Sequence, residues 1–391
     1  MTAEVRVVGL FAGIGGIELG LRRAGLEAVH LNEIDERARA VLADQFSGVE
    51  LSTDVRAMTK LPASDVVTAG FPCTDISQAG RKTGISGSQS GLVNEVFRLL
   101  ESARRPPRWL VLENVSYMLR LDKGRAMQHI IRSLEALGYR WAYRVVDARS
   151  FGLPQRRQRV IVVASRIEDP RTVLFADDAT VEFNDTIGPV DDRHAYGFYW
   201  TEGLRGLGWA RDAVPTIKGG SALGIPSPPA IWFPDTGDVG TPQVEDGERL
   251  QGFPPGWTLP AVAAGARVGV RWKQIGNAVC VPMSEWVGRR LIDPGEPVDR
   301  DWTMQFTGAR WPTAAFGGNG KIFCAQVSTT PSATDYSLRK FLALPVKPLS
   351  EKATRGFLSR AVTGNLRFSD GFLHSLRAHL DVMRDLGGRA P

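Results

Sequence analysis

The segment Val5–Gly16, with the sequence VRVVGLFAGIGG, decides the fold of this chain. Its six mostly apolar first residues predict a buried strand, and Gly13, Gly15 and Gly16 predict a tight turn into a helix. Further strands are expected at 27–32, 65–69, 109–113, 139–147 and 159–164, with a short one before Asp54, and helices near 17–24, 35–46, 92–103 and 123–137. This alternation predicts an α/β domain with a mainly parallel sheet.

The character of the chain changes after residue 165. Residues 166–271 are rich in glycine, proline, aspartate and tryptophan, which predicts a smaller, irregular β-rich domain with short strands near 213–217 and 230–233. Residues 272–292 contain a helix near 279–291 and are expected to return to the first domain. Residues 293–391 form a C-terminal extension with helices near 351–362 and 370–386, for which Ser350 and Ser369 are candidate caps.

Composition indicates a soluble protein of the cell interior. The 391 residues carry a net charge of +6, and no stretch is long and apolar enough to cross a membrane. The N-terminus enters a strand pattern at once, without the features of a secretory signal. Three cysteines lie far apart, and five histidines show no metal-ligand spacing, so we expect neither a disulfide framework nor a metal. The basic balance is compatible with a polyanionic partner.

Acidic side chains follow the first three strands at the edge where open α/β sheets bind ligands. Glu18 stands early in the helix after the glycine turn, where it would repel a phosphate, so a ligand without phosphates fits this turn better. Glu33 ends the second strand in the position of a ribose-binding carboxylate, and Asp54 follows the third. The alternative for both is a solvated loop carboxylate.

Two reactive groups are expected at the same edge. Cys73 follows the strand at 65–69, and Glu113 ends the strand at 109–113. A thiolate and a carboxylic acid at one pocket suit attack on an electron-poor ring. Taken alone, a cysteine in this position is more often a buried structural thiol. In the run 155–159, alternation along a strand would turn Arg157 and Arg159 toward one site, unless the run is a solvated strand entrance.

Six blocks in this order resemble the bacterial C5-cytosine DNA methyltransferases. They are Phe11–Gly16, Gly70–Cys73 with Ser77 and Ala79-Gly80, Glu113–Val115, Gln155–Arg159, Arg249–Pro254 and Gly276–Val279. The resemblance extends over residues 1 to about 292 and leaves the C-terminal extension unexplained. The resemblance implies a Rossmann-like S-adenosylmethionine-dependent methyltransferase sheet, with catalytic residues in 1–165, a target-recognition domain in 166–271, and transfer of a methyl group to C5 of a cytosine.

The resemblance also assigns roles to residues. Cys73 would add to C6 of the cytosine, Glu113 would bind its N3 edge as an acid, and Arg159 would hold its O2. The catalytic residues are then Cys73, Glu113, Asn114, Arg157 and Arg159. S-adenosyl-L-methionine, leaving as S-adenosyl-L-homocysteine, would contact Phe11, Ala12, Gly13, Gly15, Gly16, Glu33, Ile34, Asp54, Val55, Gly70, Pro72, Asn277 and Ala278.

Double-stranded DNA is the implied partner, and its target base must leave the stack to be reached. The DNA-contacting residues would be Ser77, Gln78, Arg81, Gln155, Thr216, Lys218 and Gly219. The glycine- and serine-rich segment 80–91 would close over the base. Tyr199, Trp200 and Trp209 are further candidates for DNA contact, although tryptophans of a small domain are usually core residues.

Some features leave room for other interpretations. Thr74 stands where many family members have glutamine, and the C-terminal extension could enlarge the DNA footprint, mediate oligomerisation or brace the core. A tRNA cytosine methyltransferase and a catalytically silent DNA-binding relative are the alternative functions. We expect a cytoplasmic monomer, with a cognate restriction endonuclease as a partner in function and not as a stable subunit.

Overall fold

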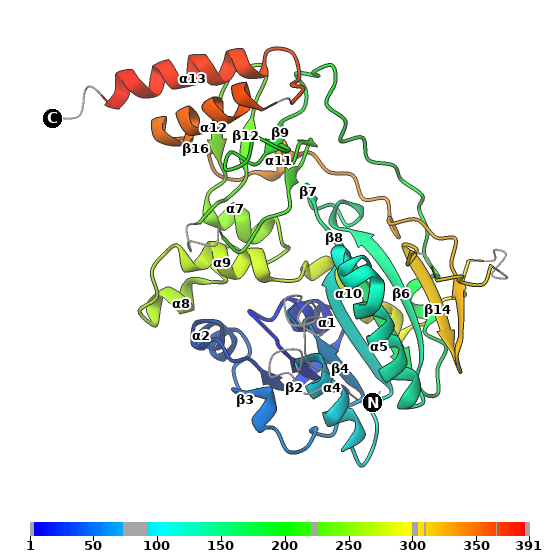
Figure 1. The fold of residues 1–391 in the computed structure, drawn as a ribbon. Helices are drawn as coiled ribbons and strands as arrows, with labels where there is room; N and C mark the ends of the chain where they lie inside the picture. The colour runs from blue at the N-terminus through cyan, green and yellow to red at the C-terminus, as the bar shows by residue number, and fades with distance from the viewer. Residues whose placement is uncertain are drawn as a thin grey trace. The chain divides into compact units, whose positions relative to one another are not determined.

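A computed structural model describes residues 4–72, 92–220, 226–298, 304–308, 310–364 and 366–387. The chain forms two compact units, each built from several segments (Figure 1). The first unit contains residues 1–151, 158–181 and 278–333, and the second contains 152–157, 182–277 and 334–391. These units cut the chain at residues other than 165, 271 and 292, and they divide the C-terminal extension between them.

A nine-stranded mixed sheet is the centre of the first unit, in the order β15-β14-β6-β8-β5-β4-β1-β2-β3. Its strands are β1 (Val5–Leu10), β2 (Leu26–Asn32), β3 (Glu50–Ser52), β4 (Val66–Ala69), β5 (Trp109–Val115), β6 (Arg140–Asp147), β8 (Gln158–Ser165), β14 (Ala314–Gly318) and β15 (Lys321–Cys324). The five strands from β3 to β5 are parallel, as predicted.

The other half of this sheet is antiparallel, which corrects the expectation of a mainly parallel sheet. Strand β8 lies between β5 and β6 and runs against both. The link between β6 and β8 contains no crossover helix, so the chain reverses direction instead of returning for a parallel pairing. Strands β14 and β15 of the C-terminal extension add two more antiparallel pairings beside β6.

Helices on the sheet follow the apolar periodicity of the sequence. They are α1 (Gly16–Arg23), α2 (Glu36–Gln45), α4 (Leu92–Glu101), α5 (Arg125–Ala136), α6 (Arg171–Leu174) and α10 (Val281–Ile292), with the 3-10 turns η1 (Val55–Ala57), η3 (Ser116–Leu119), η4 (Leu121–Gly124) and η5 (Ala148–Ser150). Apolar residues of α4 and α5 pack on the strands in one core. Helix α1 packs against α10, where Gly20 lets the two backbones approach closely.

The second unit has a small antiparallel sheet in the order β10-β9-β12-β13-β16, with a separate parallel pair of β7 and β11. These strands are β7 (Gln155–Arg156), β9 (Tyr196–Phe198), β10 (Ala210–Arg211), β11 (Val214–Pro215), β12 (Ala230–Trp232), β13 (Val239–Thr241) and β16 (Lys347–Pro348). Its helices are α7 (Val244–Arg249), α8 (Leu259–Ala263), α9 (Val270–Asn277), α11 (Leu338–Phe341), α12 (Glu351–Thr363) and α13 (Phe372–Gly387). The predicted irregular β-rich character is therefore present.

Helices α12 and α13 complete the core of this second unit. Phe357 of α12 and Phe372 of α13 lie with ring centroids 5.2 Å and 5.0 Å from Phe198 of β9. Ser350 caps α12 by accepting from the amide of residue 353, as predicted. The prediction for Ser369 is wrong, because its buried hydroxyl has no hydrogen-bond partner among the described residues. The extension thus stabilises the second unit from within.

No helix in the described part of the chain is long and apolar enough to span a membrane.

Candidate active site

The glycine turn between β1 and α1 has an unusual backbone conformation. Phe11, Gly13 and Gly15 all have positive φ angles, of 55°, 58° and 81°. A bulky residue such as Phe11 seldom adopts this conformation, and such strain concentrates at functional sites. The amide of Ala12 donates to the carbonyl oxygen of Asn32 at 2.9 Å, which ties the turn to the end of β2.

Gly13 and Gly15 lack a side chain for different reasons. A methyl group added at Gly15 would lie 2.9 Å from Cζ of Phe46, so this glycine makes room for the core. A methyl group added at Gly13 would meet nothing within 4 Å. Open space at Gly13 therefore lies on the side of the turn where a ligand can approach the backbone.

Glu33 connects this turn to the end of β2. Its Oε2 accepts from the amide of Gly13 at 2.8 Å, and its Oε1 accepts from the amide of Asp35 at 2.8 Å. The next residue, Ile34, keeps 62% of its surface exposed. A large apolar side chain that is exposed beside a carboxylate offers a surface on which a flat ring could pack.

Asp54 has a local partner in this structure. Its carboxylate caps η1 by accepting from the amide of Arg56 and forms an ion pair with the same guanidinium at 2.8 Å. This pairing holds the pKa of Asp54 below its usual range. Val55 beside it is buried in the core of the sheet. An adenine amino group would have to share the Asp54 oxygens with Arg56.

Glu113 and Arg159 meet at the edge of the sheet. Arg159 Nε lies 2.9 Å from Glu113 Oε1, and both side chains are about nine-tenths buried. A methyl group placed on Gly70 would lie 3.8 Å from Glu113 Oε2 and 3.8 Å from the carbonyl oxygen of Phe11. The structure therefore brings together the carboxyl, one arginine and the glycine turn, as the sequence predicted.

Asn114 fixes the entry to the segment that carries the predicted nucleophile. Its Nδ2 donates to the carbonyl oxygen of Phe71 at 3.0 Å, and its Oδ1 accepts from the amide of Val115 at 2.9 Å. Pro72 is exposed and is the last described residue before a gap. The predicted residues Cys73, Ser77, Gln78 and Arg81 and the segment 80–91 lie outside the described residues.

Arg157 has a different setting from the one the alternation argument predicts. Strand β7 ends at Arg156 and β8 begins at Gln158, so no continuous strand carries Arg157 and Arg159 on one face. Arg157 is 1% exposed and donates to the carbonyl oxygens of Ile217 and Gly276 at 3.1 Å and 3.2 Å. It therefore holds backbone within the second unit.

The segment 216–219 is clamped from several sides within the second unit. Gln155 Oε1 accepts from the amide of Ile217 at 3.1 Å, and the hydroxyl of Thr216 donates to the carbonyl oxygen of Arg156 at 2.7 Å. A methyl group at Gly276 would overlap the backbone of Lys218 and Gly219. The predicted DNA-contacting segment thus has a defined backbone.

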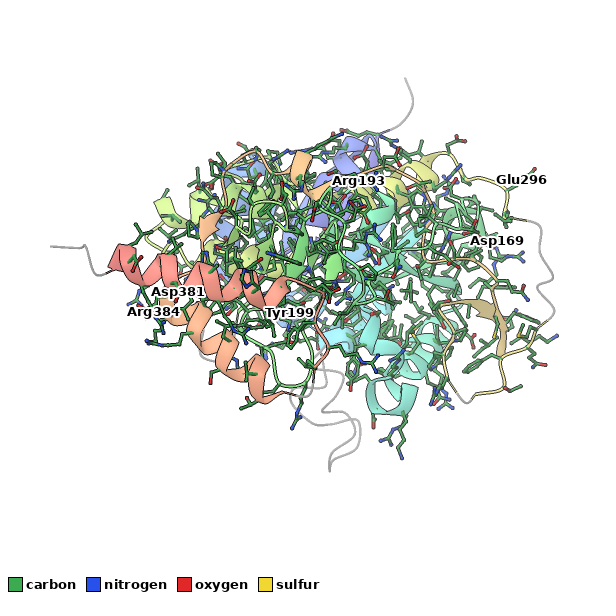
Figure 2. All side chains as sticks on the ribbon, turned by 90° about the horizontal axis from the view of Figure 1, so that it is seen from above. Asp169, Arg193, Tyr199, Glu296, Asp381 and Arg384 are labelled. Carbon is green, nitrogen blue, oxygen red and sulfur yellow. The ribbon has the colours of Figure 1, made fainter. Side chains whose placement is uncertain are left out.

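Tyr199 supports the same segment. Its hydroxyl donates to the carbonyl oxygen of Thr216 at 2.7 Å, and Lys218 Nζ lies 3.7 Å from its ring centroid (Figure 2 labels Tyr199). Lys218 also forms an ion pair with Glu202. The suggestion that Trp209 contacts DNA is wrong, because Trp209 is 4% exposed and belongs to the core of the second unit.

The remaining predicted cofactor residues are placed as follows: Gly16 and Ala278 are buried, and Asn277 is exposed at the end of α9. The two neighbours Asn277 and Ala278 fall in different compact units.

The contact between Glu18 and Thr68 was not predicted from the sequence. The hydroxyl of Thr68 on β4 donates to Glu18 Oε1 at 2.8 Å, and both residues are buried. Burial raises the pKa of Glu18 to about 7. The sequence offered one signal, an acidic residue among the apolar positions of α1 directly after the glycine turn.

Comparisons with known proteins show the family of this chain. Residues 5–192 match the family described as C-5 cytosine-specific DNA methylase. Type II methyltransferase M2.BsuMI of Bacillus subtilis (strain 168) is 48% identical over 380 residues, which cover 95% of this chain and 97% of that protein. Type II methyltransferase M.NlaX of Neisseria lactamica is 28% identical over 309 residues, which cover 73% of this chain and 96% of that protein.

Solved structures show the fold. The crystal structure of S. pombe Dnmt2 methyltransferase aligns with a TM-score of 0.56 at 15% identity, covering 74% of this chain and 99% of that chain. The structure of the Entamoeba histolytica methyltransferase EhMeth aligns with a TM-score of 0.53 at 15% identity, covering 75% and 99%. At these identities the likeness concerns the fold alone.

Proposed function

The chain belongs to the C-5 cytosine-specific DNA methylase family and is a DNA (cytosine-5-)-methyltransferase, and we propose that it uses S-adenosylmethionine and the residues around Glu113 for this reaction. As a type II methyltransferase, it would modify cytosine in one short sequence of duplex DNA for a restriction-modification system. The observation that carries the proposed site is the Glu113–Arg159 pair beside Gly70, at the end of the strand that leads to Cys73.

The glycine turn fits S-adenosylmethionine better than a dinucleotide. Open space beside Gly13, the exposed Ile34 and the Glu33 carboxylate offer a backbone approach, an apolar surface and acceptors for ribose hydroxyls. The buried Glu18 directly behind the turn disfavours a phosphate and tolerates a cation. When bound, S-adenosylmethionine supplies an electrophilic methyl group; Phe11, Gly13, Glu33 and Asp54 are the residues proposed to hold it.

Side chains of the protein activate C5 of the cytosine for methyl transfer. The thiolate of Cys73 forms a bond to C6, and the C5–C6 double bond supplies the electron pair that makes C5 a nucleophile. Glu113 binds at N3, where a proton shared between the ring nitrogen and the carboxylate stabilises the electron-rich ring. Arg159 orients Glu113 through the contact between its Nε and Glu113 Oε1.

The reaction ends with recovery of the thiolate. After the methyl group is on C5, a base removes the C5 proton, its electron pair restores the C5–C6 double bond, and the bond between C6 and Cys73 breaks. Asn114 contributes by holding Phe71, two residues before the nucleophile. We assign no residue as the final base, because a water molecule can serve.

The DNA substrate needs a separate binding surface, since the target base must leave the stack at a cost of a few kcal/mol. The clamped segment 216–219 is the proposed contact in the second unit, supported by Gln155, Arg157 and Tyr199. A cognate endonuclease would act on the same sequence without being a subunit, and the enzyme is proposed to work as a monomer in the bacterial cytoplasm.

Labelled methyl transfer tests this proposal. Duplex DNA from a host without the modification should accept label from S-adenosylmethionine, whereas tRNA should not. Cys73→Ala should lose the activity, and Cys324→Ala, which changes a half-buried thiol on β15, should retain it. Equal transfer by the Cys73→Ala variant would overturn the mechanism, and transfer to tRNA alone would reassign the substrate.

A further inference from the structure

Glu18 places an acidic group directly behind the glycine turn. Its side chain is 2% exposed, and its carboxyl lies over Gly9 of β1 and Thr68 of β4, which are partners in the register of the two strands. A methyl group on Gly9 would lie 2.9 Å from Glu18 Cδ, so the absence of a side chain at this position makes room for the carboxyl. The arrangement joins three elements that meet below the proposed cofactor site.

Only half of this carboxyl has a partner among the described residues. Oε1 accepts the hydrogen bond from Thr68, whereas Oε2 is buried without a hydrogen-bond partner. A buried acceptor without a partner is costly, so its presence calls for an explanation such as a functional role. Two residues further along the strands, about 7 Å, lie Phe11 and Gly70, which border the proposed cofactor site.

Among the described residues, Glu33 is the charged group that acts on Glu18, and no compensating cation is found beside it. Glu33, at the end of β2, raises the pKa of Glu18 further through like-charge repulsion. His30 of β2 contacts Ser52 and Glu50, and Glu285 of α10 pairs with Arg23 and Arg289. Thr68 of β4 is uncharged. A positive charge arriving at the glycine turn would therefore be the group that favours ionisation of Glu18.

Resting on the proposed use of S-adenosylmethionine, we propose that Glu18 is a positioning residue that recognises the positive sulfonium of the methyl donor. It loses its proton when the donor binds and regains it when the neutral thioether product replaces the donor. The carboxyl would thus favour the substrate over the product through charge, without touching the transferred methyl group.

The size of the effect follows from Coulomb's law. A unit charge about 10 Å away in a medium of effective dielectric about 20 changes a pKa by roughly one unit. The pKa of Glu18 is raised to about 7 in the free protein. The donor should therefore bind about tenfold more tightly above pH 7 than below pH 6, with release of about half a proton near pH 6.5.

Calorimetry with S-adenosylmethionine and S-adenosylhomocysteine tests this inference between pH 5.5 and 7.5. Titration in two buffers of different ionisation enthalpy measures the protons released. About sixfold of this tenfold limit falls between pH 5.5 and 7.5, so the affinity of the wild-type protein should rise about sixfold for the donor and less than twofold for the product. In Glu18→Gln the difference between donor and product should lose its pH dependence, and the extra proton release should disappear.

Two further variants serve as a second test and as a control. Thr68→Val removes the hydrogen bond that lowers the pKa of Glu18, so the pH dependence should move to higher pH in a protein with the same carboxyl. His30→Gln should leave the dependence unchanged, which excludes this neighbouring histidine as its source. If the donor binds with the same pH dependence in wild type and Glu18→Gln, the inference is wrong. If wild type binds no donor at any pH, the proposed cofactor is wrong.

Discussion

Alanine at Gly15 should cost more stability than alanine at Gly13, whereas alanine at Gly13 should cost more cofactor affinity. Both glycines have positive φ, and an alanine there costs about 1 to 2 kcal/mol. At Gly15 the added methyl group would also overlap Phe46, and overpacking costs about 1 to 3 kcal/mol more. At Gly13 the methyl group meets no protein atom within 4 Å. Gly15→Ala should therefore lose about 2 to 5 kcal/mol and Gly13→Ala only about 1 to 2.

Binding should show the reverse order. The methyl group at Gly13 enters the space proposed for S-adenosylmethionine, so this variant should lose at least tenfold in affinity while remaining folded. The methyl group at Gly15 turns toward the core and should weaken binding less in the folded protein. Thermal denaturation gives the stability and calorimetry gives the affinity. A larger affinity loss in Gly15→Ala than in Gly13→Ala would refute the assignment of Gly13 to the cofactor side.

Other substitutions test the remaining parts of the account. Asn114→Ala removes a donor from the carbonyl oxygen of Phe71, at a cost of about 1 to 3 kcal/mol, and should lower kcat with little change in cofactor Kd, as single-turnover kinetics would show. Gly276→Ala should displace the backbone at Gly219 and weaken DNA binding in a gel-shift assay, while calorimetry shows unchanged cofactor binding. Glu18 has a higher pKa when folded, about 7 against an ordinary 4.5, so ionisation at higher pH destabilises the fold. Glu18→Gln should therefore gain up to about 3 kcal/mol at pH 8 and almost nothing at pH 4.5, measured by denaturant titration.

The first half of the fold could be predicted because its strands and helices have strong local signals. Mostly apolar runs define β1, β4 and β5, and most of their residues are buried. The antiparallel insertion of β8 could not be predicted in the same way, because strand direction depends on pairing partners far apart in the sequence. The same holds for β14 and β15, which join the sheet from the C-terminal extension.

Some residues of the candidate site could likewise be predicted from the sequence, and others could not. Gly13 and Glu33 follow the ends of β1 and β2, and Glu113 lies near the end of β5. The parallel topology brings such positions to one edge. The alternation rule did not hold for Arg157, because the strand is interrupted at that residue. Its guanidinium donates to the carbonyl oxygens of Ile217 and Gly276, which are far away in the sequence. The link between Glu18 and Thr68 spans 50 residues, so it becomes visible only in the folded chain.

The family assignment is confirmed by the family match and by a relative that is 48% identical over 95% of this chain, whereas the roles of single residues remain predictions. Arg159 and Asn114 have contacts that suit their predicted tasks. Trp209 does not, since it is enclosed by Tyr196, Trp232 and Phe372.

Bisulfite sequencing tests the central claim most directly. The chain would be expressed in a bacterial host without cytosine methylation of its own, beside the Cys73→Ala variant. The account predicts protected cytosines at one fixed position in every copy of a single short sequence, and none in the variant. Genomic DNA without protected cytosines, or the same protected pattern with the Cys73→Ala variant, would contradict it.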